Sequence, residues 1–177
     1  MQRSQREHMI RAAGEITNEY EFVVIGSQSV VGALASPSAA CVLSMTAEIY
    51  PLHAPALADL IDGRLRTLSL FLQHFGYHAQ GIGPDTARLP RGWQQRLVAL
   101  QTQGTNLRIA HGLDPFDLFV AKACAAREKD AVFNRALLDH DAVDLAQALK
   151  RAAQLEGAVE ASRAQAWIRR LAAQGLM

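Results

Sequence analysis

Cysteines and lysines are few in this sequence, and its net charge is small. The small number of cysteines and the small net charge each exclude a class of protein. Two of the 177 residues are cysteines, and they show no spacing typical of a zinc site or a disulfide framework. The 18 basic residues, among which only Lys122, Lys129 and Lys150 are lysines, are balanced by 17 acidic residues, so the net charge is +1. A balance this close to neutral gives no global attraction to nucleic acid or to membranes.

Long apolar runs and a leader-like N-terminus are also missing. No apolar run reaches the length needed to span a membrane, and the stretch MQRSQREHMIRAAGE is too polar for a secretory signal. We therefore expect a cytoplasmic protein with no membrane partner. Cys41 and Cys124 lie in apolar stretches, where we expect buried free thiols.

The composition and the order of the segments indicate the fold class. Half of the residues are hydrophobic and 20% are charged, which is typical of a globular protein with a substantial core. Strand-like segments occur in the first part of the chain, and the last part reads as entirely helical, so an α+β fold is expected, with a mixed sheet flanked by helices. We expect residues 1–112 to form the α/β core and residues 113–177 to form a helical subdomain packed on it.

Hydrophobic periodicity and helix-breaking residues predict the individual elements. They are an amphipathic helix over Gln5–Glu19, a helix after Pro55 that Gly63 interrupts, a heavily buried helix over Leu65–Phe75 that Gly76 ends, a strand over Tyr77–Ile82, two antiparallel strands over Arg96–Gln101 and Leu107–His111, and helices from Asp114 onward.

The stretch from Phe22 to Pro51 carries the first half of a candidate site. Its apolar start, Phe22–Ile25, predicts a buried strand, Gly26-Ser27 a turn, and Gln28–Leu34 a short helix. A second apolar run, Cys41–Tyr50, predicts another strand that carries a single acid, Glu48. A glycine beside a helix start lets the backbone approach phosphate. A carboxylate on the next strand is suited to hold Mg²⁺ against the same phosphates.

A later helix carries the second half. Asp114 and Pro115 are typical of a helix start, with Asp117 in its first turn. From Leu118 to Ala126 the one charged residue is Lys122, and an unpaired buried ammonium is costly. Two interpretations stay open: Lys122 reaches a ligand cavity, or it is paired with Glu48, Asp114 or Asp130. Of the histidines, His111 alone stands out, because it ends a strand just before this helix.

Together these segments resemble the nucleotidyltransferase superfamily, in particular small bacterial nucleotidyltransferase-like proteins related to abortive-infection toxins. The resemblance covers roughly Phe22 to Ala148. It rests on the turn Gly26-Ser27, the acid-x-acid position Thr46-Ala47-Glu48, the Pro51 region, the segment Leu60-Ile61-Asp62-Gly63, and the helix segment from Asp117 through Lys122 to Arg127-Glu128-Lys129-Asp130. The first acid of the pair is absent, since Thr46 offers a hydroxyl without charge. No carboxylate occurs on the strand Leu107–His111, where active members often place a third.

The resemblance implies roles for the motif residues. Glu48, Lys122 and Asp130 would form the catalytic group, in which Lys122 contacts the nucleotide phosphates and Asp130 orients its basic neighbours. The nucleotide-binding residues would be Gly26, Ser27, Lys122 and Arg127. Glu48 would be the ligand of Mg²⁺, the implied cofactor, and a nucleoside triphosphate is the implied partner.

Three functions follow from these observations. The first is transfer of a nucleotidyl group from a nucleoside triphosphate to an RNA or protein acceptor. The second is a catalytically degenerate nucleotidyltransferase fold that binds a nucleotide or a protein partner, which the missing acid favours. The third is an interaction module whose last helix carries the surface, with an apolar side formed by Val159, Ala164, Trp167, Ile168 and Leu171.

Overall fold

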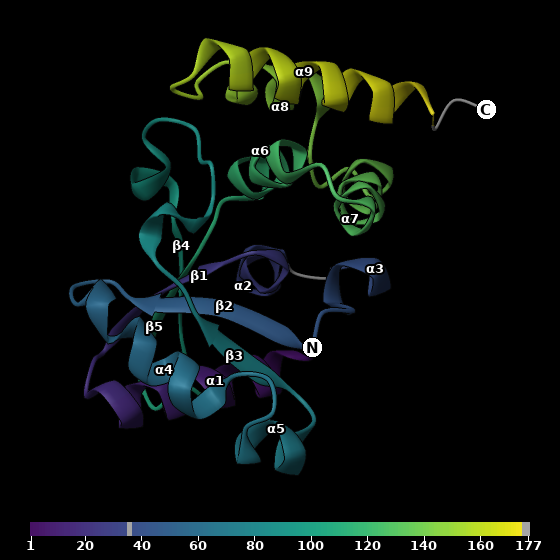
Figure 1. Ribbon diagram of the computed structural model, residues 1–177. Helices are drawn as coiled ribbons and strands as arrows, with labels where there is room; N and C mark the ends of the chain where they lie inside the picture. The colour runs from purple at the N-terminus through teal and green to yellow at the C-terminus, as the bar shows by residue number, and fades with distance from the viewer. Residues whose placement is uncertain (35–36, 175–177) are drawn as a thin grey trace.

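The computed structural model describes residues 1–34 and 37–174 and has an α+β architecture with a mixed five-stranded sheet between two groups of helices (Figure 1). The strands are β1 (Glu21–Ile25), β2 (Thr46–Pro51), β3 (His78–Gly81), β4 (Val98–Gln101) and β5 (Ile109–Gly112). Their order is β3-β2-β1-β5-β4, with β1 antiparallel to β2 and parallel to β5. β3 runs parallel to β2, and β4 is antiparallel to β5. The expected fold class is confirmed.

One face of the sheet packs against α1 (Arg3–Thr17) and α4 (Ala58–Leu65), with the short α5 (Leu70–Phe75) beside them (Figure 1). Because side chains alternate along a strand, Phe22 and Val24 of β1 face this layer. They join one hydrophobic cluster with residues of α1 and α4, among them Met9, Ile10 and Ile61. The amphipathic helix predicted near the N-terminus therefore covers one face of the sheet.

The other face of the sheet carries the remaining helices. These are α2 (Val30–Ala33), α3 (Ala39–Val42), α6 (Pro115–Ala125), α7 (Glu128–Asp139), α8 (Leu145–Ala152) and α9 (Ala158–Ala173). Val23 and Ile25 of β1 belong to the same buried cluster as Leu118 and Phe119 of α6. The helices that follow Gly112 thus share their core with the sheet, while the proposed subdomain boundary at residues 112–113 stays a prediction.

The last helix packs on its own domain. Ala164, Ile168 and Leu171 of α9 are buried in the shared core, and Trp167 packs against it. Val159, which we assigned to the same apolar side, is instead 65% exposed. Among the described residues, no helix combines the length and the apolarity needed to cross a membrane.

The predicted strand over Cys41–Tyr50 is too long, which is a first correction. Residues Ala39–Val42 form α3, where Cys41 is buried, and β2 begins only at Thr46. The reason lies in the partner strand: β1 ends at Ile25, whose register partner is Glu48. Residues before Thr46 therefore have little of β1 left to pair with. The predicted helix over Gln28–Leu34 is present as a 3₁₀ turn, Ser27–Ser29, followed by α2.

The segment after Pro55 needs a second correction. Gly63 does not interrupt a helix, because α4 runs through it as far as Leu65. The break falls later, where Leu68 adopts a positive φ of 68° and Ser69 accepts a hydrogen bond from Leu72 N to start α5. Leu68 and Leu70 are 85% and 81% exposed, so the predicted heavily buried helix over Leu65–Phe75 is wrong. Gly76 does end α5, in the left-handed conformation.

Candidate active site

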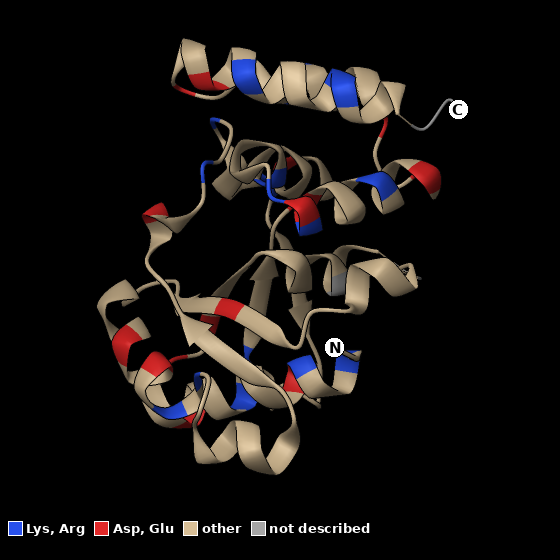
Figure 2. Cartoon of the chain, turned by 45° about the vertical axis from the view of Figure 1, so that its right-hand side comes forward, with Lys and Arg blue, Asp and Glu red and all other residues tan. Residues whose placement is uncertain are grey.

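A cleft of about 680 Å³ separates the sheet from α6 and α7, and most of the predicted site residues line it. The sheet side contributes Gly26, Ser27, Thr46 and Glu48. The helical side contributes Lys122, Arg127 and Lys129, and the loop after β3 contributes Arg88. Figure 2 shows acidic and basic positions close together at the junction of α6 and α7. Among the described residues that line the cleft, four side chains are basic and Glu48 is the one carboxylate, so the cleft favours an anion.

The turn after β1 holds Gly26 against Glu48. Gly26 has φ 75° and ψ −164°, a conformation that is essentially restricted to glycine. A Cβ atom at this residue would lie 2.1 Å from Glu48 Oε2. Ser29 donates a hydrogen bond from Oγ to the Gly26 carbonyl (2.7 Å), which fixes the turn. The glycine is therefore needed for the backbone conformation and for the close approach of the carboxylate.

On the opposite wall, Lys122 and Arg127 share one carboxylate. Lys122 Nζ donates to Asp130 Oδ1 at 3.0 Å, and the ammonium lies 4.3 Å from the centre of the Phe133 ring. Arg127 donates to Asp130 Oδ2 from Nε at 2.6 Å and to Oδ1 from Nη2 at 3.2 Å. Asp130 is completely buried, whereas the Arg127 side chain is 53% exposed. Of the three acids proposed as partners of Lys122, Asp130 is the one that pairs with it.

The pKa values of this cluster follow from burial and pairing. Burial lowers the pKa of Lys122, and the hydrogen bond to Asp130 opposes that shift. Burial alone would raise the pKa of Asp130, but hydrogen bonds from Arg127 and Lys122 outweigh it and lower that pKa. The hydrogen bond to Asp130 raises the pKa of Arg127. Two cations thus share one buried anion, and the surplus positive charge lies at the cleft.

The residues present suit Mg²⁺ bound to a phosphate better than a metal site made by the protein alone. Mg²⁺ is usually held by one or two carboxylates together with waters and substrate phosphates. Glu48, pressed against the Gly26 turn, supplies one such carboxylate. Thr46 Oγ1 is within hydrogen-bond distance of His78 Nε2 (3.0 Å). The described part of the chain contains no group of three His, Cys, Asp or Glu side chains that could hold a metal.

One buried feature of the helix start was missed by the sequence interpretation. Asp114 caps α6 as predicted, with Pro115 at the first position. Asp117 does more than begin the helix: it is fully buried and accepts two hydrogen bonds from Arg96, both 2.9 Å, and one from Arg151 at 2.7 Å. This network ties the loop before β4 to α6 and α8. Arg96 and Arg151 are far from Asp117 in sequence, so no local signal predicts that they pair with it.

The predicted site residues fall into two groups. Gly26, Ser27, Glu48, Lys122 and Arg127 line the cleft, and Asp130 lies buried behind its helical wall. In contrast, His111 does not line the cleft. Its Nε2 is 2.7 Å from Oε2 of Glu21, which lies at the opposite end of β1 from Gly26.

A mixed sheet with a Gly-Ser turn after its central strand, an acid on the neighbouring strand and the Lys122 ammonium across the cleft are consistent with a nucleotidyltransferase-like fold. Residues 7–167 match the family described as "Nucleotidyltransferase of unknown function (DUF6036)", and the chain belongs to that family. No curated protein and no solved structure matches the chain.

Proposed function

We propose that the chain binds a nucleoside triphosphate in this cleft and transfers its nucleotidyl group to a hydroxyl acceptor on RNA or protein. The proposal rests on one observation: two walls of the cleft face each other. Gly26 and Glu48 form one wall, and the Lys122–Asp130–Arg127 cluster forms the other. A triphosphate placed between them meets surplus positive charge on one side and a single carboxylate on the other.

Each wall has a distinct task in this proposal. The backbone of Gly26 and Ser27 lies beside the phosphates in this proposal, and the space that a side chain at residue 26 would fill is taken by the Glu48 carboxylate. Lys122 neutralises phosphate charge, and Asp130 keeps its ammonium and the Arg127 guanidinium in place. Glu48 would be the protein ligand of Mg²⁺, which when bound supplies charge neutralisation at the phosphates. Such transfer depends mainly on positioning and charge stabilisation.

A second candidate function is nucleotide binding without transfer. It is favoured by the presence of one carboxylate among the described residues of the cleft, and by Thr46 in the place of a first acid. In this case the same residues hold the triphosphate, and no acceptor is modified.

Calorimetry with ATP, GTP, CTP and UTP, each with and without Mg²⁺, tests the binding step. Transfer is tested by incubating the chain with α-³²P-labelled triphosphates and either total RNA or protein acceptors, and measuring label in each. Binding with labelled acceptor supports the first function, and binding without label supports the second. If none of the four triphosphates binds, both are wrong.

A further inference from the structure

A threonine and a histidine form a hydrogen-bonded pair at the cleft that the proposed function does not use. Thr46 lines the cleft at the start of β2, two residues before Glu48 and on the same face of the strand. Its Oγ1 lies 3.0 Å from His78 Nε2, on the neighbouring strand β3. This is the distance expected between a hydroxyl nucleophile and its general base.

The backbone around Thr46 holds its hydroxyl in place. Thr46 N donates to Ser44 Oγ at 3.3 Å, and Ser44 Oγ donates to the Thr46 carbonyl at 3.1 Å. Gln28, which is fully buried, donates from Nε2 to the Ser44 carbonyl at 2.7 Å. Ile25 pairs with Glu48 in the antiparallel register. Counting two residues beyond that pair leads to Ser27 on one segment and to Thr46 on the other. Thr46 therefore starts its strand opposite the turn where we place the phosphates.

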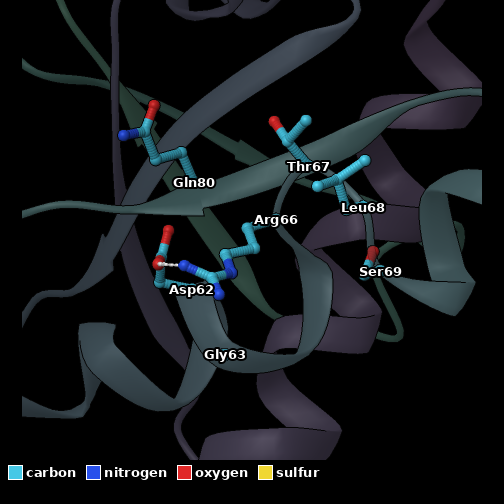
Figure 3. Close-up of a pocket in the computed structure, with 7 residues that line it drawn as sticks. All are labelled: Asp62, Gly63, Arg66, Thr67, Leu68, Ser69 and Gln80. Atoms are coloured by element: carbon cyan, nitrogen blue, oxygen red, sulfur yellow. Dashed lines mark ion pairs between the residues drawn. The ribbon is translucent and has the colours of Figure 1, made fainter.

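His78 also connects the cleft to a second depression. Its Nε2 lies 3.2 Å from Thr67 Oγ1, and Thr67 lines a pocket of about 530 Å³ beside β3. Figure 3 shows this pocket, with Gln80 toward one end of the strand and Thr67 toward the other. Gln80 lines both the pocket and the cleft. Thr46 from the cleft and Thr67 from the pocket thus both reach the same ring nitrogen, His78 Nε2.

We propose that Thr46 is a site of self-nucleotidylation, with His78 as its general base; this rests on the proposed binding of a triphosphate in the cleft. Thr46 Oγ1 attacks the α-phosphorus, and the bond from that phosphorus to the oxygen bridging the α- and β-phosphates breaks. Pyrophosphate leaves with the electron pair of that bond, next to the basic wall. The hydroxyl proton passes to His78 Nε2, and the product is a nucleoside monophosphate ester of Thr46.

Burial lowers the pKa of His78 and so favours the neutral form of the ring, which is the form that can take the proton. In the tautomer with the proton on Nδ1, Nε2 is the acceptor and faces the Thr46 hydroxyl. Nδ1 is buried and has no hydrogen-bond partner among the described residues, so no neighbouring group stabilises the ring on that side once Nε2 takes the proton.

The test uses the full chain with α-³²P- and γ-³²P-labelled triphosphates. We expect label from the α-phosphate alone, a mass increase of one nucleoside monophosphate, and a modified peptide that maps to Thr46. Thr46→Val keeps the shape of the side chain and removes the hydroxyl, so labelling should fall by at least about a hundredfold, whereas Thr46→Ser should retain it. His78→Gln can still hydrogen-bond but cannot take the proton, and a loss of about 10²- to 10⁴-fold is expected.

Calorimetry on the same samples measures triphosphate affinity. This affinity distinguishes a failure of self-nucleotidylation from a failure of the proposed triphosphate binding. A chain that binds a triphosphate but takes up no α-label, or whose label maps to Ser27 or Ser44, overturns self-nucleotidylation and leaves binding intact. Equal labelling of the wild type and a folded Thr46→Val variant overturns it as well. A chain that binds no triphosphate overturns both.

Discussion

The carboxylate of Glu48 lies in the space that a side chain at Gly26 would fill. Glu48 Oε2 is 2.1 Å from the position of a Cβ atom at Gly26, which directly follows β1, while Glu48 lies on the antiparallel strand β2. The contact joins the turn and the acid, which are twenty-two positions apart in sequence, into one wall of the cleft. The identity of residue 26 therefore affects both the backbone and the placement of the acid.

Gly26→Ala should destabilise the chain and displace Glu48. A φ of 75° with ψ −164° costs a residue with a Cβ atom roughly 1–3 kcal/mol, and the new methyl group forces the carboxylate to move. Urea unfolding measures the change in stability, and calorimetry measures the effect on triphosphate binding.

Gly63→Ala is the matched control for this substitution. Gly63 lies inside α4, and nothing stands within 4 Å of a Cβ atom there. Alanine should therefore stabilise the helix by about 0.5–1 kcal/mol. If both substitutions change stability by the same amount and with the same sign, the conformation of Gly26 is not what makes that glycine necessary.

Lys122→Met should weaken triphosphate binding while leaving the chain folded. The variant keeps most of the apolar stem and removes a charge that is buried beside Asp130. Loss of a charged hydrogen bond predicts about ten- to a hundredfold weaker binding, or roughly 1.5–3 kcal/mol. Lys150→Met, on the exposed side of α8, is the control and should bind as the wild type does.

Unchanged binding by Lys122→Met would make Lys122 a member of a structural ion pair. A gain in thermal stability together with unchanged binding would strengthen that assignment, because replacing a buried charge by an apolar side chain often stabilises a protein. Arg127 would remain bound to Asp130 in this variant, which limits the penalty of leaving the acid without Lys122.

Both walls of the cleft could be predicted from local patterns. A short apolar run before Gly26-Ser27 indicated the central strand, and a lone lysine in an apolar helix indicated that Lys122 needs a partner or a cavity. Which acid pairs with Lys122 could not be predicted, because Glu48, Asp114 and Asp130 all stayed open as partners. The choice depends on the turn at Ala126, whose left-handed conformation folds α7 back so that Asp130 meets Lys122.

One error arose where long-range strand pairing decides local structure, and the other where a local break in the chain was missed. Cys41 lies in an apolar run that continues into β2, yet it is helical, because β1 has ended by that point. Leu68 and Leu70 have the periodicity of a buried helix, yet the chain breaks between α4 and α5 and leaves both exposed. Ser69, which caps α5, was a local signal of that break.

Asp130→Asn should destabilise the chain more than any surface change on α7. It leaves Lys122 buried with no charged partner, and breaking a buried ion pair costs roughly 3–5 kcal/mol. Asp139→Asn is the matched control, because its pair with Arg135 is long (3.8 Å) and its side chain is 57% exposed. That control should change stability by less than about 1 kcal/mol.

The effect of Asp130 should also depend on pH. Its pKa is lowered in the folded chain, so its contribution is complete above the ordinary aspartate pKa of about 3.9. The contribution is lost as the pH falls through the lower folded value. The difference in unfolding free energy between the wild type and Asp130→Asn should therefore shrink on acidification below pH 4 or so. A difference that grows on acidification would show that Asp130 is not stabilised as the anion.

Triphosphate binding should depend only modestly on Mg²⁺. Among the described residues of the cleft, Glu48 is the one carboxylate, and the basic wall of Lys122, Arg127 and Lys129 can hold the phosphates without a metal ion. Titration in EDTA should therefore weaken binding by less than a hundredfold, which corresponds to about 2.7 kcal/mol. Glu48→Gln should remove most of whatever Mg²⁺ dependence is measured and leave affinity in EDTA unchanged or slightly improved, since it also removes a negative charge near the phosphates. A larger loss in EDTA, or a Glu48→Gln variant that keeps the full Mg²⁺ dependence, would mean that other groups bind the metal.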